Sequence, residues 1–249
     1  MNESWINFLT EIDKIIKEFE QDGCDIICFR GHSNKDWDLE PTLFVHQKKY
    51  NKNLKQIKNI ENALYFDFVT NAGTLLNSYS TDWEILFLMR HHGVPTRILD
   101  WTENFGTALF FALSGQDNSP TIYILDPYKL NQHSFEKGSI PNPLRDLNFS
   151  YTDAYLEQKS NPFSFPLAMI PPRTSDRLFA QKGLFTLQGT NNKPLNKILE
   201  LKDCFRKVEI PQDAIPSAHK FLKLFGVNNY SIFPDLDGLA KHITSELFK

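Results

Sequence analysis

Apolar positions recur with helical spacing through much of the chain. Near the N-terminus they lie three and four residues apart, which predicts a helix over residues 4–20 with Ser4 as N-cap and Gly23 as stop. Asp82 is a second predicted N-cap, and Gly93 ends the helix that follows it. The same spacing predicts further helices over residues 57–79, 103–113, 215–225 and 235–248.

Short apolar runs predict the strands. Residues 26–29 form an apolar run without alternation, which indicates a strand over 25–30 that is buried on both faces, with Arg30 and Gly31 at its end. β-Branched and aromatic residues predict further strands over 121–125, 165–170, 183–188 and 204–210. Because helices crowd the first half and strands the second, we predict an α+β fold. It would consist of N-terminal helices packed on a mixed, mostly antiparallel sheet, in a single domain of residues 1–249.

Composition narrows the classes of protein that the chain can belong to. The chain has 249 residues, with 27 Lys and Arg against 30 Asp and Glu, which gives a net charge of −3. This charge excludes a nucleic-acid binder driven by overall charge and leaves room for a local basic patch. The apolar stretch over residues 104–116 is too short to span a membrane, and the first residues do not read as a secretion signal. We therefore expect a cytoplasmic protein without a membrane partner.

Two polar clusters are set in apolar sequence. In the first, residues 29–32, an arginine at a buried strand is unfavourable unless it meets an anion, so the guanidinium binds either an external phosphate or carboxylate or a structural carboxylate. The second, residues 91–102, holds two histidines, an arginine and an aspartate between two helices. Arg97 and Asp100 could simply pair with each other. Thr102 is a possible cap for the next helix, whose N-terminus would suit phosphate.

The third cluster spans residues 172–185. Arg177 and Gln181 are four residues apart and would share a face of a short helix, and Gln181 stands just before a strand. Ordinary helix-surface pairing is the competing interpretation. The three cysteines show no zinc spacing and are read as buried free thiols, and no metal site is predicted.

The three clusters together resemble the FRG domain family, named for a phenylalanine-arginine-glycine motif. That motif is residues 29–31, followed by Trp37, Leu39 and Pro41–Thr42. The block over residues 90–102 resembles the long second signature of the family, and residues 177–185 resemble the third. The resemblance runs from about residue 24 to 245. Two positions depart from it: Arg90 stands where the family usually has glutamine, and Phe44 where an arginine is common.

The first motif is also similar to that of ADP-ribosyltransferases, in which the arginine helps to hold NAD. This resemblance implies NAD as a possible substrate and a site of two sets of residues. The catalytic set is Arg30, His92, Asp100 and Gln181. The cofactor-binding set is Arg30, Gly31, Thr96, Arg97, Trp101 and Arg177. Gln181 would replace the glutamate that orients the ribose in those enzymes, which puts transferase activity in doubt.

Three hypotheses follow. The chain is an NAD-using enzyme, of the ADP-ribosyltransferase or NAD-glycohydrolase type; or a non-catalytic module that binds a nucleotide, nucleic acid or protein; or a scaffold whose polar clusters are structural. For the first two, bacterial phage defence or toxin action is the expected setting, with an unknown protein or nucleic-acid target. Convergence of Arg30, Asp100 and Gln181 on one concave pocket would weigh against the scaffold.

Overall fold

Six strands form the sheet at the centre of the protein. A computed structural model describes residues 2–76, 79, 81–115, 119–135, 138–159, 163–171 and 183–248. The strands are β1 Cys28–His32, β2 Ile98–Thr102, β3 Thr121–Leu125, β4 Leu167–Met169, β5 Gly183–Leu187 and β6 Phe205–Glu209. Their order is β4-β5-β2-β1-β3-β6, and every neighbouring pair is antiparallel. The predicted α+β class is confirmed, while the boundaries of the domain stay a prediction.

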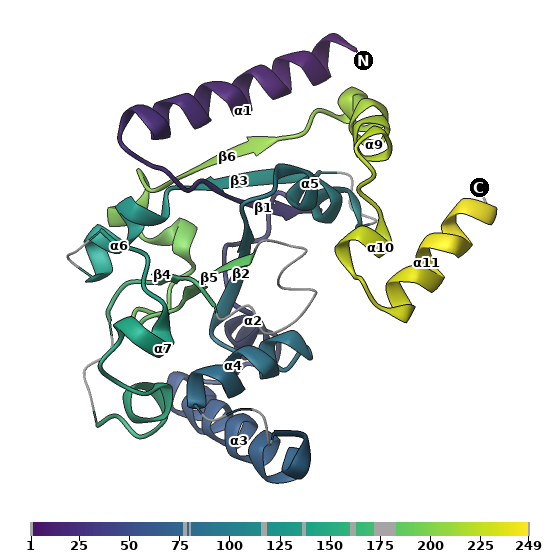
Figure 1. The fold of residues 1–249 in the computed structure, drawn as a ribbon. Coiled ribbons are helices and arrows are strands. Elements are labelled where there is room, and N and C mark those ends of the chain that lie inside the picture. Colours follow the sequence, from purple (N-terminus) through teal and green to yellow (C-terminus); the bar gives the residue numbers. More distant parts are fainter. Residues whose placement is uncertain are drawn as a thin grey trace.

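Helices surround the sheet (Figure 1). They are α1 Glu3–Gln21, α2 Thr42–Lys49, α3 Leu54–Ala72, α4 Asp82–His91, α5 Phe105–Leu113, α6 Pro127–Phe135, α7 Pro143–Asp146, α9 Ile215–Leu224, α10 Asn229–Ile232 and α11 Leu236–Leu247. A π-helical turn covers Thr152–Leu156. Helix α1 lies along β6 at one end of the molecule, and α3 and α4 lie at the other. No helix within the described ranges has both the length and the apolar character of a membrane span.

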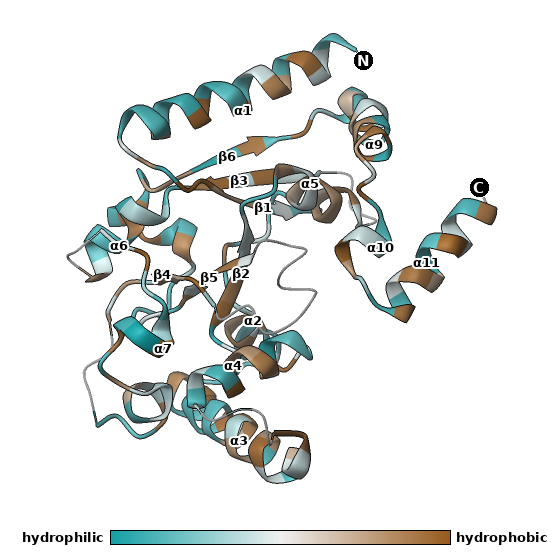
Figure 2. Cartoon of the chain, viewed as in Figure 1, coloured by the Kyte–Doolittle hydropathy of each residue, from teal (hydrophilic) through white to brown (hydrophobic). Residues whose placement is uncertain are grey.

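Three large apolar clusters hold these elements together. The first packs α1, α5 and α9 on the face of the sheet that carries Phe29, Ile122 and Val208. The second joins α4 and the π-helical turn to β4 and β5, and the third lies on the opposite side of the central strands. Strands β2 and β3 are coloured largely as hydrophobic in Figure 2, which agrees with their burial. Because apolar clusters cover most of the sheet, the polar side chains of β1 and β2 are accessible to solvent only where these clusters leave a cavity.

Several boundaries differ from the sequence predictions. Strand β1 begins at Cys28 and continues to His32, so Arg30 lies in its middle, because its pairing with β3 extends to Thr121. The helix predicted over residues 57–79 ends at Ala72, and Leu75, which lies beyond this end, is exposed. The N-caps are Asn2, Thr81 and Asn104 rather than Ser4, Asp82 and Thr102. In each case the observed cap accepts a hydrogen bond from a first-turn N–H.

Several elements of the structure were not predicted, among them α2 and β2. Helix α2 lies where the sequence analysis predicted no helix, because it begins after Pro41 without a side-chain cap and has no clear apolar face. Strand β2 lies inside the second polar cluster, where residues 98–102 were read as a corner between helices. Its five residues alternate between the two faces of the sheet, which places Asp100 opposite Leu99 and Trp101.

Candidate functional site

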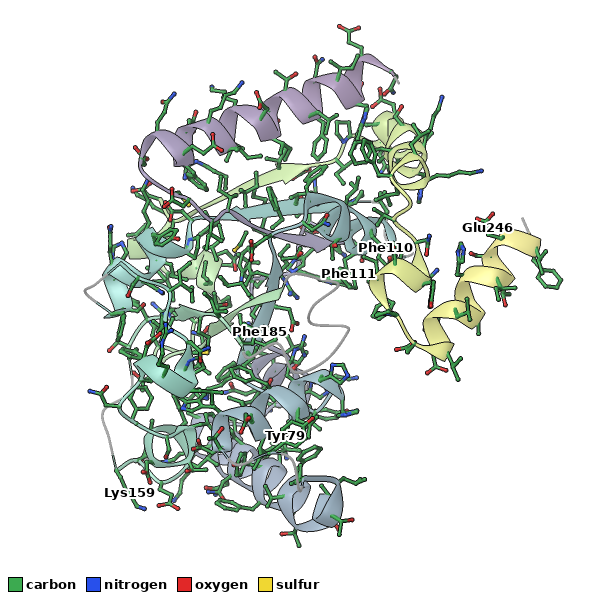
Figure 3. All side chains as sticks on the ribbon, in the orientation of Figure 1. Tyr79, Phe110, Phe111, Lys159, Phe185 and Glu246 are labelled. Carbon is green, nitrogen blue, oxygen red and sulfur yellow. The ribbon has the colours of Figure 1, made fainter. Side chains whose placement is uncertain are left out.

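An open cavity of about 1040 Å³ lies beside β1 and β2. Strand β1 contributes Arg30, Gly31 and His32, and the loop before α2 contributes Trp37 and Glu40. Helix α4 adds Arg90 and the histidine pair that follows, and helix α5 and strand β5 add Phe111 and Phe185, which are labelled in Figure 3. A cavity of this volume is in the range of small-molecule sites.

Arg30 stands at the base of this cavity. Its Nε donates to Nε2 of His32 at 2.9 Å, and its Nη1 donates to the main-chain oxygen of Asp100 at 2.6 Å. The carboxylate of Asp100 is 3.9 Å away, and no partner for Nη2 exists among the described residues. Burial lowers the pKa of Arg30 to about 10, so the side chain stays charged at neutral pH. The guanidinium is thus only partly paired within the protein, and its side chain is 22% exposed.

Arg90 forms an ion pair with the carboxylate of Asp100. Its Nε lies 3.1 and 3.0 Å from the two carboxylate oxygens, its Nη2 also donates to Asp100, and its Nη1 donates to Thr42 Oγ1 at 3.3 Å. Burial alone would lower the pKa of Arg90, but Asp100 raises it. Two arginines therefore flank the carboxylate of Asp100 beside the cavity.

His32 is a buried, neutral histidine that is in contact with Arg30. Burial, together with the nearby charge of Arg30, lowers its pKa to about 3. Because its Nε2 accepts from Arg30, the proton of the neutral ring sits on Nδ1. The ring packs edge-on against Trp37 and Tyr123. His32 thus fixes the direction of the Arg30 fork without adding charge.

Aromatic rings form the walls. Phe87 from α4 stacks on Phe185 from β5 with their centroids 5.4 Å apart, and both line the cavity. His91 and His92 lie edge to face at 5.0 Å beside them. Trp37 is 51% exposed, so its ring is available for stacking on a ligand. The lining of the cavity therefore combines apolar aromatic rings with charged side chains.

The structure divides the residues expected at the site. Arg30, Gly31, His92, Asp100 and Trp101 all line the cavity. The ring of Trp101, expected to stack on a ligand, is instead packed in the core, with its Nε1 donating to Thr186 Oγ1 at 3.1 Å. The predicted short helix over residues 175–181, with Arg177 and Gln181, lies outside the described residues.

Arg97 and Thr96 do not line this cavity. Arg97 is buried and donates from Nε and Nη2 to the two carboxylate oxygens of Glu61. Its Cζ lies 4.2 Å from the centroid of the Tyr155 ring. It borders a separate cavity of about 390 Å³. The suggested pairing of Arg97 with Asp100 is not formed, because Asp100 is held by Arg90 and Arg97 by Glu61.

Some cavity residues were missed by sequence reasoning. Arg90 was noted only as a departure from the family pattern and Thr42 only as part of the first motif, and Glu40 and Lys48 were not considered. Lys48 pairs with Glu40 at 2.8 Å. The sequence feature that pointed to Glu40 and Thr42 was their position on either side of Pro41, a residue of the first motif. Among the described residues, no cluster of histidine, cysteine and acidic side chains is arranged to hold a metal ion.

The pKa of His32 leads to a pH prediction. The unfolded chain protonates this histidine near pH 6.5, whereas the folded protein does so only near pH 3. The unfolded state therefore binds more protons as the pH falls between these values, and stability drops by at most about 1.4 kcal/mol per pH unit. We expect His32→Gln to flatten the pH dependence of the unfolding free energy between pH 6.5 and 4.5, measured by urea titration. An unchanged slope in His32→Gln would contradict the neutral buried ring.

The fold and the cavity define an α+β protein with a partly paired arginine beneath an open site. Residues 25–120 match the FRG domain, so this segment of the chain carries an FRG domain. The matched segment runs from just before β1 to just before β3, and so includes the first two motifs. No curated protein and no solved structure matches the chain.

Proposed function

We propose that this FRG domain binds NAD or a related pyrophosphate nucleotide in the cavity above Arg30. The observation that carries the proposal is the state of the Arg30 guanidinium, which is charged, close to a 1040 Å³ opening and not fully paired. A guanidinium binds phosphate oxygens through parallel charge-assisted hydrogen bonds. Its Nη2 is the group that would donate to a pyrophosphate oxygen.

The mixture of charges at the cavity favours a ligand that carries both signs. Arg30, Arg90 and Lys48 supply positive charge, and Asp100 and Glu40 are among the acidic groups that offset it. NAD combines an anionic pyrophosphate with a cationic nicotinamide ring. The basic side chains of the cavity can therefore attract the pyrophosphate, and the acidic side chains can attract the nicotinamide ring. The exposed ring of Trp37 offers a surface on which a base can stack.

Secondary-structure placement supports the similarity to ADP-ribosyltransferases that the motifs suggested. Arg30 lies on a central strand, and α5, which follows the second motif, packs directly against that strand. Gln181 precedes β5 by two residues in the sequence, and β5 pairs with β2 next to β1. In a transfer reaction a nucleophile would attack C1′ of the ribose, the bond from C1′ to nicotinamide would break with its electrons, and the nucleophile would lose its proton.

Binding and chemistry are separated by one pair of measurements. Isothermal titration is expected to show binding of NAD and ADP-ribose, and nicotinamide release from NAD then distinguishes an enzyme from a module that only binds. Arg30→Ala should weaken ADP-ribose binding by roughly 10–100-fold, because a hydrogen bond to a charged group contributes about 1.5–3 kcal/mol. Arg30→Lys should recover part of this loss.

The control is Arg145→Ala, because Arg145 is exposed and pairs with the adjacent Asp146 away from the cavity. Its affinity should equal that of the wild type. Absence of binding of either nucleotide at millimolar concentration would overturn the proposal. Full affinity in a folded Arg30→Ala variant would show that the anion is held elsewhere.

A further inference from the structure

Glu40 is a buried carboxylate that the protein satisfies on one oxygen alone. The residue is 8% exposed, and its Oε2 pairs with Lys48 Nζ at 2.8 Å. Its Oε1 is buried and has no hydrogen-bond partner among the described residues. Buried carboxylate oxygens are unfavourable unless they accept hydrogen bonds, so an unpartnered one beside a cavity indicates a donor supplied from outside.

The main chain around Glu40 is held firmly. The Leu39 N–H donates to Asn196 Oδ1 at 2.8 Å, and the Glu40 N–H donates to the oxygen of Asp38 at 2.9 Å. Pro41 follows as the N-cap of α2. Glu40, which lines the cavity, is thus carried by a fixed segment of backbone, as a preorganised binding group requires.

A purely structural role for Glu40 would leave a different pattern of contacts. A carboxylate before a helix commonly accepts from the first-turn N–H groups. Here the Leu43 N–H donates to Thr96 O, and the N–H groups of Phe44 and Val45 donate to Pro41 O. Lys48, its ion-pair partner, has a side chain that is 58% exposed, and so binds only the outer oxygen.

We infer that Oε1 of Glu40 accepts a hydrogen bond from a ribose hydroxyl of the bound ligand. An ionised carboxylate only accepts, so its partner must be a donor such as a hydroxyl. Glu40 is two residues from Thr42, whose hydroxyl accepts from Arg90, so the carboxylate lies close to the arginines that would hold phosphate. A phosphate and a hydroxyl separated by a few atoms are the features of a nucleotide sugar. This inference rests on the proposed function, because it assigns a second contact in the same cavity.

The test compares Glu40→Gln with the wild type against two probes, ADP-ribose and inorganic pyrophosphate. Loss of the carboxylate should weaken ADP-ribose binding about tenfold or more. Pyrophosphate has no ribose hydroxyl, so its affinity should stay the same or rise as a negative charge is removed. Glu11→Gln on the exposed side of α1 is the matched control and should bind both probes like the wild type.

Thermal melting of the same variants separates binding from folding. Glu40→Gln is expected to melt at or above the wild-type temperature, because it removes a buried charge with an unpartnered oxygen. A lower melting temperature with unchanged ADP-ribose affinity would overturn the inference in favour of a structural role. If Arg30→Ala loses ADP-ribose and Glu40→Gln does not, the proposed function stands and the Glu40 contact is overturned. If the wild type binds neither probe, both are overturned.

Discussion

Replacing Arg97 with alanine is expected to lower the free energy of unfolding by about 3–5 kcal/mol, because the change leaves a buried carboxylate without its partner. Arg97 Nε donates to Glu61 Oε1 at 2.5 Å, and Arg97 Nη1 donates to the main-chain oxygen of Gln188 at 3.0 Å. Tyr151 also donates to Glu61 Oε1, at 2.7 Å. These bonds join α3, β2, the π-helical turn and the segment after β5, so their loss affects several elements together.

Urea titration of three variants would isolate the unpaired charge as the cause. Arg97→Lys keeps the charge without the fork and should lose less stability than Arg97→Ala. The double variant Arg97→Met with Glu61→Leu removes both charges, and it should be more stable than Arg97→Ala. If Arg97→Ala loses less than about 1 kcal/mol, Glu61 must find another partner, and the network does not lock these elements.

Arg97 also provides a test of which arginine of the second motif serves the cavity. Arg97 does not line it, whereas Arg90 does. ADP-ribose affinity of Arg97→Ala, measured at a temperature where the variant is still folded, should therefore equal that of the wild type. This outcome would separate the effect of the residue on stability from any effect on the ligand.

Most of the longer helices and most strands could be predicted because their apolar periodicity is local. The predicted helix over residues 4–20 and the strand over 121–125 agree with α1 and β3 to within a residue. Strand β2 was missed because its five residues lie within a polar cluster, and only pairing with β5 and β1 makes them extended. Helix α2 was missed because its stability comes from the packing of Leu43 and Phe44 rather than from a cap.

The partners of charged side chains depend on tertiary structure and could not be predicted from spacing. Arg97 and Asp100 are three residues apart in the sequence, and this spacing alone indicated an ion pair between them. In the structure β2 directs Asp100 towards α4, so that the carboxylate meets Arg90, ten residues earlier. Arg97 precedes the strand and meets Glu61 from α3 instead. The sequence identified the chemical types present, and the packing of α3 and α4 decided which of them meet.

Gly31→Ala is expected to be the other strongly destabilising change, with a loss of about 3 kcal/mol or more, at the upper end of overpacking effects. A Cβ at position 31 would lie 1.9 Å from the main-chain oxygen of Ala108 and 2.6 Å from the main-chain nitrogen of Ala112. Both atoms belong to the backbone of α5, so no change of side-chain rotamer can relieve the contact. The glycine of the phenylalanine-arginine-glycine motif therefore permits the close approach of α5 to β1.

Gly106→Ala is the matched control, because its Cβ would come no closer than 3.2 Å, and only to side-chain atoms. It should melt within a few degrees of the wild type, helped by the higher helix propensity of alanine. If Gly31→Ala folds, α5 must move away from β1 and carry Thr107 and Phe111 with it, both of which line the cavity. Its ADP-ribose affinity should then fall together with its stability. A melting temperature equal to that of Gly106→Ala would show that α5 has room to spare and that the motif glycine serves another purpose.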